Sequence, residues 1–246
     1  MQIITAIIQR CLPVIAGVLL VASCTETREE VCFPRVDESL PQYVIGFGGL
    51  FYEATRRSRL EGATGVKLLP IMVNDFQRGW IARSKPGDVK DTSLAITAAK
   101  GKQFNGILLS VSPSIIKGMD RKEHKQCRVL VSREQLQSMT GMSIPEKGQF
   151  WIYQVQSKQL NKPAANYPIL QSRVDEFLTG CIEQGERFQL PDFSRQCIRM
   201  TDGWSVHWSN DRARPVGGKP VQIRFKEVDK LLEQLEGNLY ENIRAH

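Results

Sequence analysis

The chain has 246 residues, of which 41% are hydrophobic and 24% are charged, and its formal net charge at pH 7 is +7. About 205 residues follow Leu40, enough for one sizeable hydrophobic core, and the absence of internal repeats or low-complexity tracts excludes a repeat array or a largely disordered protein. The basic residues are spread along the chain. This pattern is more typical of a solvated surface than of a patch that binds anionic lipid headgroups.

The amino terminus has the features of a bacterial lipoprotein signal peptide. One basic residue, Arg10, precedes an apolar run over residues 11–22, and small residues stand directly before Cys24. The run has about a dozen residues, whereas a helix that spans a bilayer needs roughly 20. We therefore expect residues 1–23 to be removed and Cys24 to be lipidated, which would attach the protein to a membrane. An ordinary signal peptide or an unusually short anchor is the alternative.

Residues 24–42 are rich in charge and show little periodicity, which predicts a solvated tether in front of a domain that spans residues 43–246. The mature protein would then be a lipid-anchored protein of the bacterial cell envelope that faces the periplasm. No acidic residue follows Cys24 directly, and by resemblance to sorting rules in Gram-negative bacteria this indicates the outer membrane. An exported lipoprotein is not expected to bind nucleic acid.

The first element of the domain is predicted to be a strand that ends in a glycine-rich turn. Residues 43–51 read YVIGFGGLF, so the glycines are closely spaced just before a helix-like segment. Glycines let the main chain approach a ligand, and successive N–H groups directed into one concavity can bind a carboxylate or a phosphate. Taken alone, such a segment is more often a plain turn.

Strands are predicted near residues 66–74, 79–83, 93–98 and 105–111, followed by a helix over residues 113–123. The helix has a serine N-cap and a proline at its first position. Glu123 falls on the face that Ile115, Ile116 and Met119 would bury, and no residue three or four positions away is basic. A local ion pair therefore does not explain this carboxylate, which leaves a longer-range salt bridge or a functional role.

Further strands are predicted near residues 127–131, 150–155 and 204–208, and helices near residues 169–183 and 227–243. Tyr153 lies on one of these strands, where core packing is favoured over a place in a pocket. His207 would point away from the side shared by the two neighbouring tryptophans and is expected at the surface. Strands in the middle of the chain with helices around them define an α+β domain.

Four cysteines besides Cys24 remain in the predicted mature chain, Cys32, Cys127, Cys181 and Cys197. In an oxidising compartment they allow three pairings, of which we favour Cys181 with Cys197; the alternative is that Cys127 and Cys181 are buried thiols. Their spacing fits no zinc site, so no metal is predicted.

Several of these segments together resemble the gamma-glutamylcyclotransferase family, whose fold is shared with the ChaC-type enzymes. The family loop (F/Y)GS(L/N) corresponds to FGGL at residues 47–50, and its Leu-Asp-x-x-Glu motif to MDRKE at residues 119–123. FQRGW at residues 76–80 and FNGIL at residues 104–108 are similar to two family strands in the same order. The resemblance covers residues 43–131 and extends more loosely through residues 168–172 and the helix that follows.

The resemblance implies a small mixed β-barrel with flanking helices and a pocket at one end. It also implies a small-molecule γ-glutamyl substrate, whose free α-amine attacks its own γ-carbonyl to give 5-oxoproline and a free amine, without metal or cofactor. Glu123 would be the catalytic acid and base. The residues expected to bind substrate are Ile45, Gly46, Phe47, Gly48, Gly49, Leu50 and Arg173.

Two positions depart from the family pattern. Gly49 stands where the family has serine, and Arg173 stands where it has a tyrosine, seven residues before Gly180. Arginine could grip a substrate carboxylate as a bidentate donor. The competing hypothesis is a non-catalytic, ligand-binding or structural envelope lipoprotein on the same fold. We favour the enzyme, because a protein without turnover would have no need of Glu123.

Overall fold

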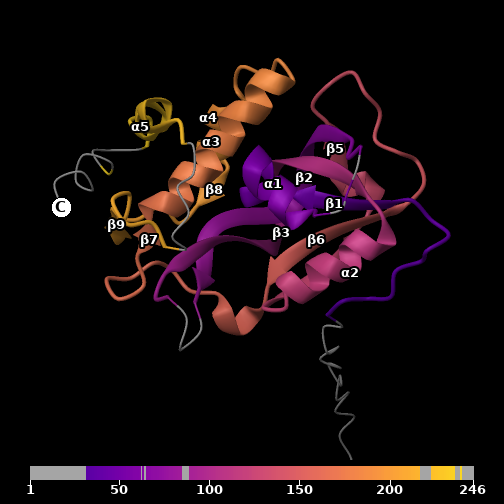
Figure 1. The fold of residues 1–246 in the computed structure, drawn as a ribbon, viewed down its shortest axis with the longest axis horizontal. Helices are drawn as coiled ribbons and strands as arrows, with labels where there is room; N and C mark the ends of the chain where they lie inside the picture. The colour runs from indigo at the N-terminus through magenta and orange to yellow at the C-terminus, as the bar shows by residue number, and fades with distance from the viewer. Residues whose placement is uncertain are drawn as a thin grey trace, which may run out of the picture. The chain divides into compact units, whose positions relative to one another are not determined.

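The computed structural model describes residues 32–61, 63, 65–84, 89–216, 223–235 and 239 (Figure 1). The predicted signal peptide, Cys24 and the first part of the predicted tether lie outside the described residues. The described residues all fall within one compact unit, Val31–His246. None of the helices in the described part of the chain has the length and apolar character that a membrane crossing requires.

A mixed sheet forms the centre of this unit. Its strands are β1 (Gln42–Gly46), β2 (Leu68–Arg83), β3 (Thr92–Val111), β4 (Gln126–Val131), β5 (Leu136–Ser138), β6 (Gln149–Val155) and β8 (Thr201–Asp202). The order is β4-β6-β1-β3-β2-β5, and β8 pairs with β2. Two pairings, β1 with β6 and β2 with β8, are parallel, and the others are antiparallel. A separate parallel pair joins β7 (Ile169–Leu170) to β9 (Trp208–Ser209).

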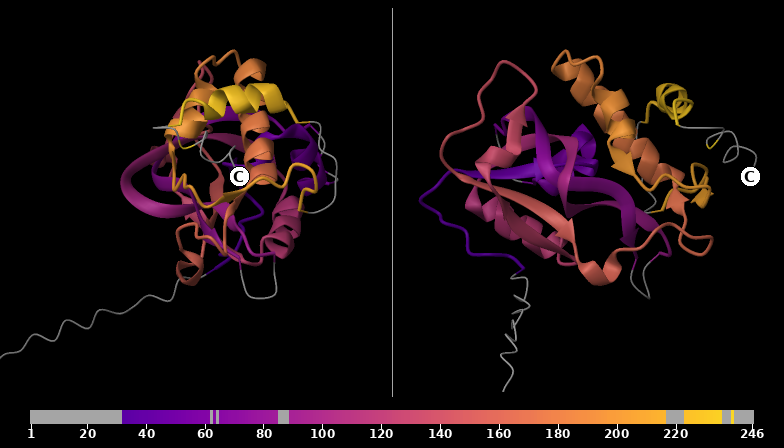
Figure 2. Two further views of the ribbon diagram at one scale, coloured as in Figure 1. Left: turned by 90° about the vertical axis from the view of Figure 1, so that its left-hand side faces the viewer. Right: turned by 180° about the vertical axis from the view of Figure 1, so that it is seen from behind.

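The helical elements are η1 (Gly49–Phe51), α1 (Glu53–Arg59), α2 (Pro113–Lys122), η2 (Arg133–Gln135), η3 (Ser157–Gln159), α3 (Gln171–Arg187), α4 (Phe193–Arg199) and α5 (Phe225–Leu232). Figures 1 and 2 show α3, α4 and α5 gathered on one side of the sheet, with α2 apart from them. The predicted α+β class with flanking helices is confirmed. The described strands follow an open order that ends at β4 and β5, and no closed barrel is detected among them.

The four strands predicted in the middle of the sequence are two long strands, β2 and β3. The predicted breaks at residues 75–78 and 99–104 lie inside these strands, and residues 76–78, 103 and 104 keep partners in the ladder. The register shift between Asn74 and Phe76 leaves Asp75 of β2 and residues 99–102 of β3 out of the pairing, and Asp75 adopts a φ of 63° there. Such an irregularity takes residues out of the pairing without ending either strand.

Both faces of the sheet are covered by apolar side chains. Along β1, Val44 packs into one buried cluster together with residues of α3 and α4, and its neighbour Ile45 packs into a second cluster with β2, β3 and β6. Successive side chains of a strand point to opposite faces, so a short apolar strand can serve two clusters.

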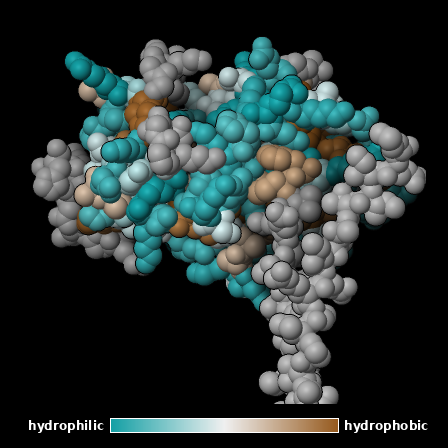
Figure 3. All heavy atoms as spheres, turned by 90° about the horizontal axis from the view of Figure 1, so that it is seen from below, coloured by the Kyte–Doolittle hydropathy of each residue, from teal (hydrophilic) through white to brown (hydrophobic). Residues whose placement is uncertain are grey.

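The face of the molecule in Figure 3 is mostly hydrophilic, with apolar side chains in small patches.

The helix predicted over residues 113–123 is α2, with Ser112 as its N-cap and Pro113 at its first position. The Ser112 side chain accepts a hydrogen bond of 3.4 Å from the Ile115 N–H. The prediction extends one residue too far, because Glu123 is the C-cap rather than a residue of the helix.

The strand predicted over residues 204–208 is wrong except at its last residue, where β9 begins. Gly203 has a φ of 80°, and its backbone turns against Trp80 so closely that a Cβ atom would lie 2.8 Å from the Trp80 carbonyl oxygen. The chain then continues as a loop. Trp204 and Trp208 stack with ring centroids 5.7 Å apart, and His207 is exposed, as predicted.

The helix predicted near residues 227–243 is α5, which begins two residues earlier and ends at Leu232. Val228, Leu231 and Leu232 are buried, in agreement with the predicted apolar face. Arg212 holds this helix to α3, since its guanidinium donates to both Asp175 and Asp229. Most of the predicted helix beyond residue 235 lies outside the described residues.

Two disulfides link the four cysteines. Cys181 of α3 pairs with Cys197 of α4, which confirms the favoured pairing, and Cys32 pairs with Cys127 at the start of β4. The alternative of buried free thiols at Cys127 and Cys181 is therefore wrong. Both residues are buried, as that alternative expected, but as half-cystines.

Candidate active site

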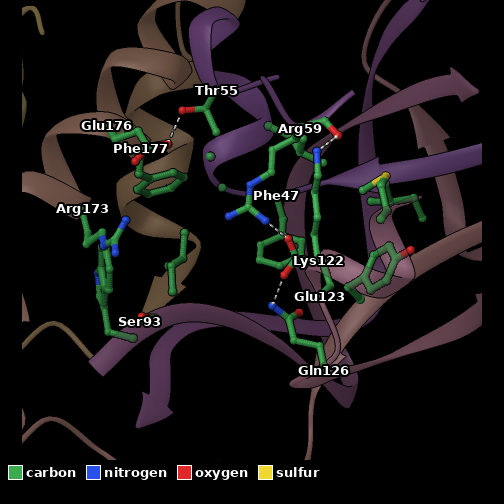
Figure 4. A pocket seen from close by; sticks show the side chains of 18 residues that line it. Phe47, Thr55, Arg59, Ser93, Lys122, Glu123, Gln126, Arg173, Glu176 and Phe177 are labelled. Carbon is green, nitrogen blue, oxygen red and sulfur yellow. Dashed lines mark hydrogen bonds and ion pairs between the residues drawn. The ribbon is translucent and has the colours of Figure 1, made fainter. Parts of the chain in front are cut away.

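A cavity of about 290 Å³ opens where β1 ends, and it lies between α1, the end of α2 and the first two turns of α3 (Figure 4). Its lining includes glycines, apolar side chains and charged side chains. The lining residues are Ile45, Phe47, Gly48, Gly49, Leu50, Thr55, Arg59, Trp80, Ser93, Leu94, Met119, Lys122, Glu123, Gln126, Tyr153, Arg173, Glu176 and Phe177. Six segments far apart in the sequence thus contribute residues to one site.

Most of the residues expected to bind substrate line this cavity. The exception is Gly46, which packs between β3 and η1, where a Cβ atom would lie 3.0 Å from side-chain atoms of Ile107 and Leu50. Gly46 therefore permits close packing at the end of β1. Tyr153 is buried, as predicted, and it also reaches the cavity.

The loop after β1 leaves several main-chain donors without protein acceptors. The N–H groups of Phe51 and Tyr52 donate to the carbonyl oxygens of Gly48 and Gly49. Among the described hydrogen bonds, the N–H groups of Gly48, Gly49 and Leu50 have no acceptor. A ligand oxygen in the cavity could satisfy such donors.

Gly180 brings α3 against this loop. A Cβ atom at Gly180 would lie 2.5 Å from the Tyr52 nitrogen and 2.7 Å from the Phe51 Cβ atom, so only glycine allows this approach. The close contact sets the position of the preceding turns of α3. Arg173 and Glu176 project from those turns into the cavity (Figure 4).

Glu123 faces the cavity from the end of α2. Its side chain is 21% exposed, and its carboxylate forms an ion pair with Arg59 of α1. It also accepts a hydrogen bond of 3.1 Å from the Gln126 side-chain amide. The sequence showed no local basic partner for this carboxylate, and the structure supplies a distant one.

The end of α2 is also attached to α1 through Lys122. Its ammonium group donates to the carbonyl oxygens of Ser58 and Arg59, each at 3.2 Å. These are exposed carbonyl groups at the C-terminal end of α1, where a cation is stabilised by the helix dipole. The contact fixes the two helix ends that carry Arg59 and Glu123.

A buried network supports α2 from behind the cavity. Asp120 accepts hydrogen bonds from Arg128 at 2.9 and 3.2 Å and from the Tyr153 hydroxyl at 2.7 Å. Burial, followed by the hydrogen bond to Asp120, raises the pKa of Tyr153 well above its usual value. Tyr153 therefore remains a neutral donor, and Asp120 is held one turn before Glu123.

Arg78 supports the loop from within the core. Its guanidinium is fully buried and donates to the side chain of Thr201 at 2.8 Å, to Asn105 at 2.7 and 2.8 Å and to the Cys197 carbonyl at 3.1 Å, with a longer contact of 3.4 Å to the Phe47 carbonyl. Burial lowers the pKa of Arg78 to about 9, so the group is still charged at neutral pH. The family resemblance covered this residue, but the sequence did not assign it a role.

Glu176 belongs to none of the motifs that predicted the site. The Thr55 hydroxyl donates to its Oε1 atom at 2.6 Å, and a Cβ atom at Gly49 would lie 3.0 Å from the same oxygen. The glycine that departs from the family loop is therefore opposite a carboxylate that occupies the adjacent space. The available signal was helical spacing, since Glu176 follows Arg173 by three residues and shares its face.

The charged side chains around the cavity have both signs. Arg59, Lys122 and Arg173 are cationic, and Glu123 and Glu176 are carboxylates. This arrangement suits a ligand that carries both charges, such as an amino-acid derivative. Within the described part of the chain, no group of three or more His, Cys, Asp or Glu side chains is placed to hold a metal ion.

No protein-family model and no curated protein matches the sequence. Among solved structures, a gamma-glutamyl cyclotransferase aligns with a TM-score of 0.49 at 9% identity, over 78% of this chain and 98% of its own. A yeast gamma-glutamyl cyclotransferase specific to glutathione aligns with a TM-score of 0.40 at 9% identity, over 84% and 96% of the two chains. A human protein aligns with a TM-score of 0.48 at 10% identity, over 80% and 100%.

These alignments span 78–84% of this chain and almost all of each matched chain. At identities near 10% the likeness concerns the fold alone.

Proposed function

We propose that this protein is a cyclotransferase that converts a γ-glutamyl amine or peptide into 5-oxoproline and the free amine. The observation that carries the proposal is the position of Glu123 in one cavity with the unpaired N–H groups of the Gly48–Gly49 loop and with Arg173. A carboxylate, a set of main-chain donors and a cation are the groups that this intramolecular reaction needs.

In this reaction the α-amine nitrogen forms a bond with the γ-carbonyl carbon and closes a five-membered ring. The carbonyl oxygen becomes an oxyanion, and the bond to the leaving nitrogen then breaks. Because both reacting groups belong to one molecule, correct folding of the substrate alone can contribute up to about 7–11 kcal/mol in ideal cases. The apolar wall formed by Trp80, Leu94 and Phe177 would favour such a folded conformation.

Glu123 is the proposed general base and general acid. It would take a proton from the attacking nitrogen and return it to the leaving nitrogen, with its carboxylate oriented by Arg59 and Gln126. The N–H groups of Gly48, Gly49 and Leu50 would stabilise the oxyanion, a role that glycine supports without a side chain. The guanidinium of Arg173 would bind the α-carboxylate of the glutamyl group.

The test is release of 5-oxoproline from γ-glutamyl amines, γ-glutamyl dipeptides and glutathione by the folded protein. Glu123→Gln keeps the shape of the side chain and removes the carboxylate that accepts and returns the proton, and we expect its kcat to fall by about 10²–10⁴. Glu146→Gln, at an exposed glutamate outside the cavity, is the matched control and should keep full activity.

If no compound in the panel releases 5-oxoproline, the non-catalytic alternative takes the place of this proposal. A ligand-binding or structural lipoprotein would still bind γ-glutamyl compounds or their analogues in this cavity without converting them. Titration of the same panel against the protein separates binding from turnover.

We also propose that the protein is anchored in the bacterial cell envelope through lipidated Cys24 and faces the periplasm, with the outer membrane as the expected site. The proposal rests on the apolar run of residues 11–22 and on the small residues before Cys24. The Cys32–Cys127 and Cys181–Cys197 disulfides are consistent with an oxidising compartment. Expression with a labelled fatty acid should label the full-length chain, and Cys24→Ser should abolish the label; a labelled serine variant would contradict the proposal.

A further inference from the structure

In the proposed cyclisation, on which this inference rests, the attacking nitrogen must lose two protons. The α-amine of the substrate enters as an ammonium group, and the product ring carries a single N–H. One of the two protons can pass through Glu123 to the leaving nitrogen, which then departs as a neutral amine. The other proton must leave before the nitrogen can attack, and it needs its own acceptor.

Glu176 is the second carboxylate of the cavity, and it lies directly against the loop proposed to bind the glutamyl group. Its Oε1 atom would be 3.0 Å from a Cβ atom at Gly49 and accepts a hydrogen bond of 2.6 Å from the Thr55 hydroxyl. These contacts fix one carboxylate oxygen beside the Gly48–Gly49 backbone. The side chain is only partly buried and stays open to the cavity.

Glu176 differs from Glu123 in its charge partners. Glu123 is paired with Arg59, whereas no lysine or arginine of the described residues lies within ion-pairing distance of Glu176. An unneutralised carboxylate that faces a cavity attracts a cation. Arg173, one turn earlier on the same face of α3, likewise forms no ion pair in the described part of the chain, so the two side chains offer opposite charges to one ligand.

Other charged and titratable groups face Glu176 from the surrounding elements. Arg173 belongs to α3, Arg59 to α1, and Lys122 and Glu123 to the end of α2. Tyr52, beside the loop, is close enough that the carboxylates of Glu183 and Glu176 add to the effect of burial in raising its pKa. None of these groups neutralises Glu176 directly.

We propose that Glu176 binds the α-ammonium group of the substrate and accepts the first of the two protons that this group must lose, while Arg173 binds the α-carboxylate. The ammonium group, once deprotonated, becomes the free amine that attacks the γ-carbonyl carbon. Glu123 then transfers the second proton from the ring nitrogen to the leaving nitrogen as the bond to that nitrogen breaks. The proton held by Glu176 returns to solvent or to the released amine, so charge and protons balance over the cycle.

The first experiment measures binding without turnover. In Glu123→Gln protein, titration compares γ-glutamyl-alanine with glutaryl-alanine, which is the same molecule without the α-amine. We expect γ-glutamyl-alanine to bind at least about tenfold more tightly, since a hydrogen bond between charged groups is worth this much or more. Adding Glu176→Gln should remove the preference and leave the affinity for glutaryl-alanine nearly unchanged.

Glu186→Gln in the same background is the control, because Glu186 lies on the last turns of α3 outside the cavity. That variant should keep the preference for γ-glutamyl-alanine. A preference that survives Glu176→Gln, or a protein that binds neither compound, would overturn the proposal. Loss of turnover in the unsubstituted protein would remove the proposed function but would leave this binding result intact, so the two failures can be told apart.

The second experiment tests the proton transfer through the pH dependence of kcat/KM. Without Glu176 only substrate whose amine is already deprotonated can react, and below the pKa of that amine this fraction rises tenfold per pH unit. The defect of Glu176→Gln should therefore shrink by about tenfold per unit between about pH 6 and pH 8, whereas that of Glu123→Gln should not follow this slope. A purely structural role for Glu176 would give a defect that does not change with pH.

Discussion

Arg59, the last residue of α1, forms an ion pair with Glu123, the C-cap of α2, across 64 residues of sequence. The pair joins two helix ends at the rim of the cavity, and Lys122 reinforces the same junction. Glu123 is thereby held in one orientation without being cut off from the cavity. The pair is partly exposed, since 44% of the Arg59 side chain and 21% of the Glu123 side chain is accessible.

Arg59→Met should show whether the ion pair orients the Glu123 carboxylate or stabilises the fold. We expect 5-oxoproline release to fall by about tenfold because Glu123 loses its guanidinium partner, while the free energy of unfolding changes by less than about 1 kcal/mol, as for other exposed pairs. Steady-state kinetics and urea denaturation measure the two effects. A large loss of stability with unchanged kcat would contradict this role for the pair.

Gly49→Ala should reduce binding and turnover, because the added Cβ atom would lie 3.0 Å from the Glu176 carboxylate and 3.3 Å from the Thr55 methyl group and would displace both. In Glu176→Ala protein the same substitution should have a much smaller effect, since the crowded oxygen is gone. A double-mutant cycle of ligand affinities gives the coupling, expected at about 1 kcal/mol. Additive effects of the two substitutions would show that Gly49 and Glu176 do not interact.

Arg78→Lys should destabilise the core by about 3 kcal/mol, because a lysine has three donors in one compact group and cannot reproduce the hydrogen bonds of the guanidinium to the buried oxygens of Asn105 and Thr201. The urea midpoint measures the loss. The exposed change Arg57→Lys is the control and should leave the midpoint almost unmoved. Equal midpoints for the two variants would exclude the buried hydrogen-bond network as a stabilising element.

The Cys181–Cys197 disulfide should contribute about 3 kcal/mol to the free energy of unfolding, the value expected for a loop of this length. The double variant Cys181→Ala and Cys197→Ala avoids a free thiol in the core. Denaturation under oxidising conditions compares it with the parent protein. If reducing agent lowers the stability of the double variant as much as that of the parent, the effect belongs to Cys32–Cys127 instead.

Elements whose patterns were strong could be predicted well. The serine cap and the proline at the start of α2 located that helix to within a residue, and the apolar run of β1 located the first strand. The two long strands were divided in error, because polar residues at a bulge and at an exposed stretch of hairpin have the same composition as a loop. The prediction of a strand over residues 204–208 was wrong because Gly203, which has a positive φ, redirects the chain.

For the candidate site, the motifs led to Glu123, to the loop and to Arg173, all of which contribute to one cavity. Glu176 and Arg59 were missed because neither belongs to a motif of the family and neither is unusual on a helix surface. Their place in the site depends on how closely α1 and α3 approach the loop. That distance is set by packing at Gly180, and no local pattern encodes it.

By itself, the sequence determined the α+β class and most of the helices and strands, and its motifs predicted Glu123, the glycine-rich loop and Arg173 as candidate site residues, because these depend on local periodicity, capping and short motifs. Only the tertiary structure decided that Glu123 has Arg59 as its partner and that Glu176 occupies the space beside Gly49. Contacts between residues 64 or 127 positions apart in the chain arise from the packing of whole elements. Charge pairing across a cavity is therefore a property of the fold rather than of any segment within it.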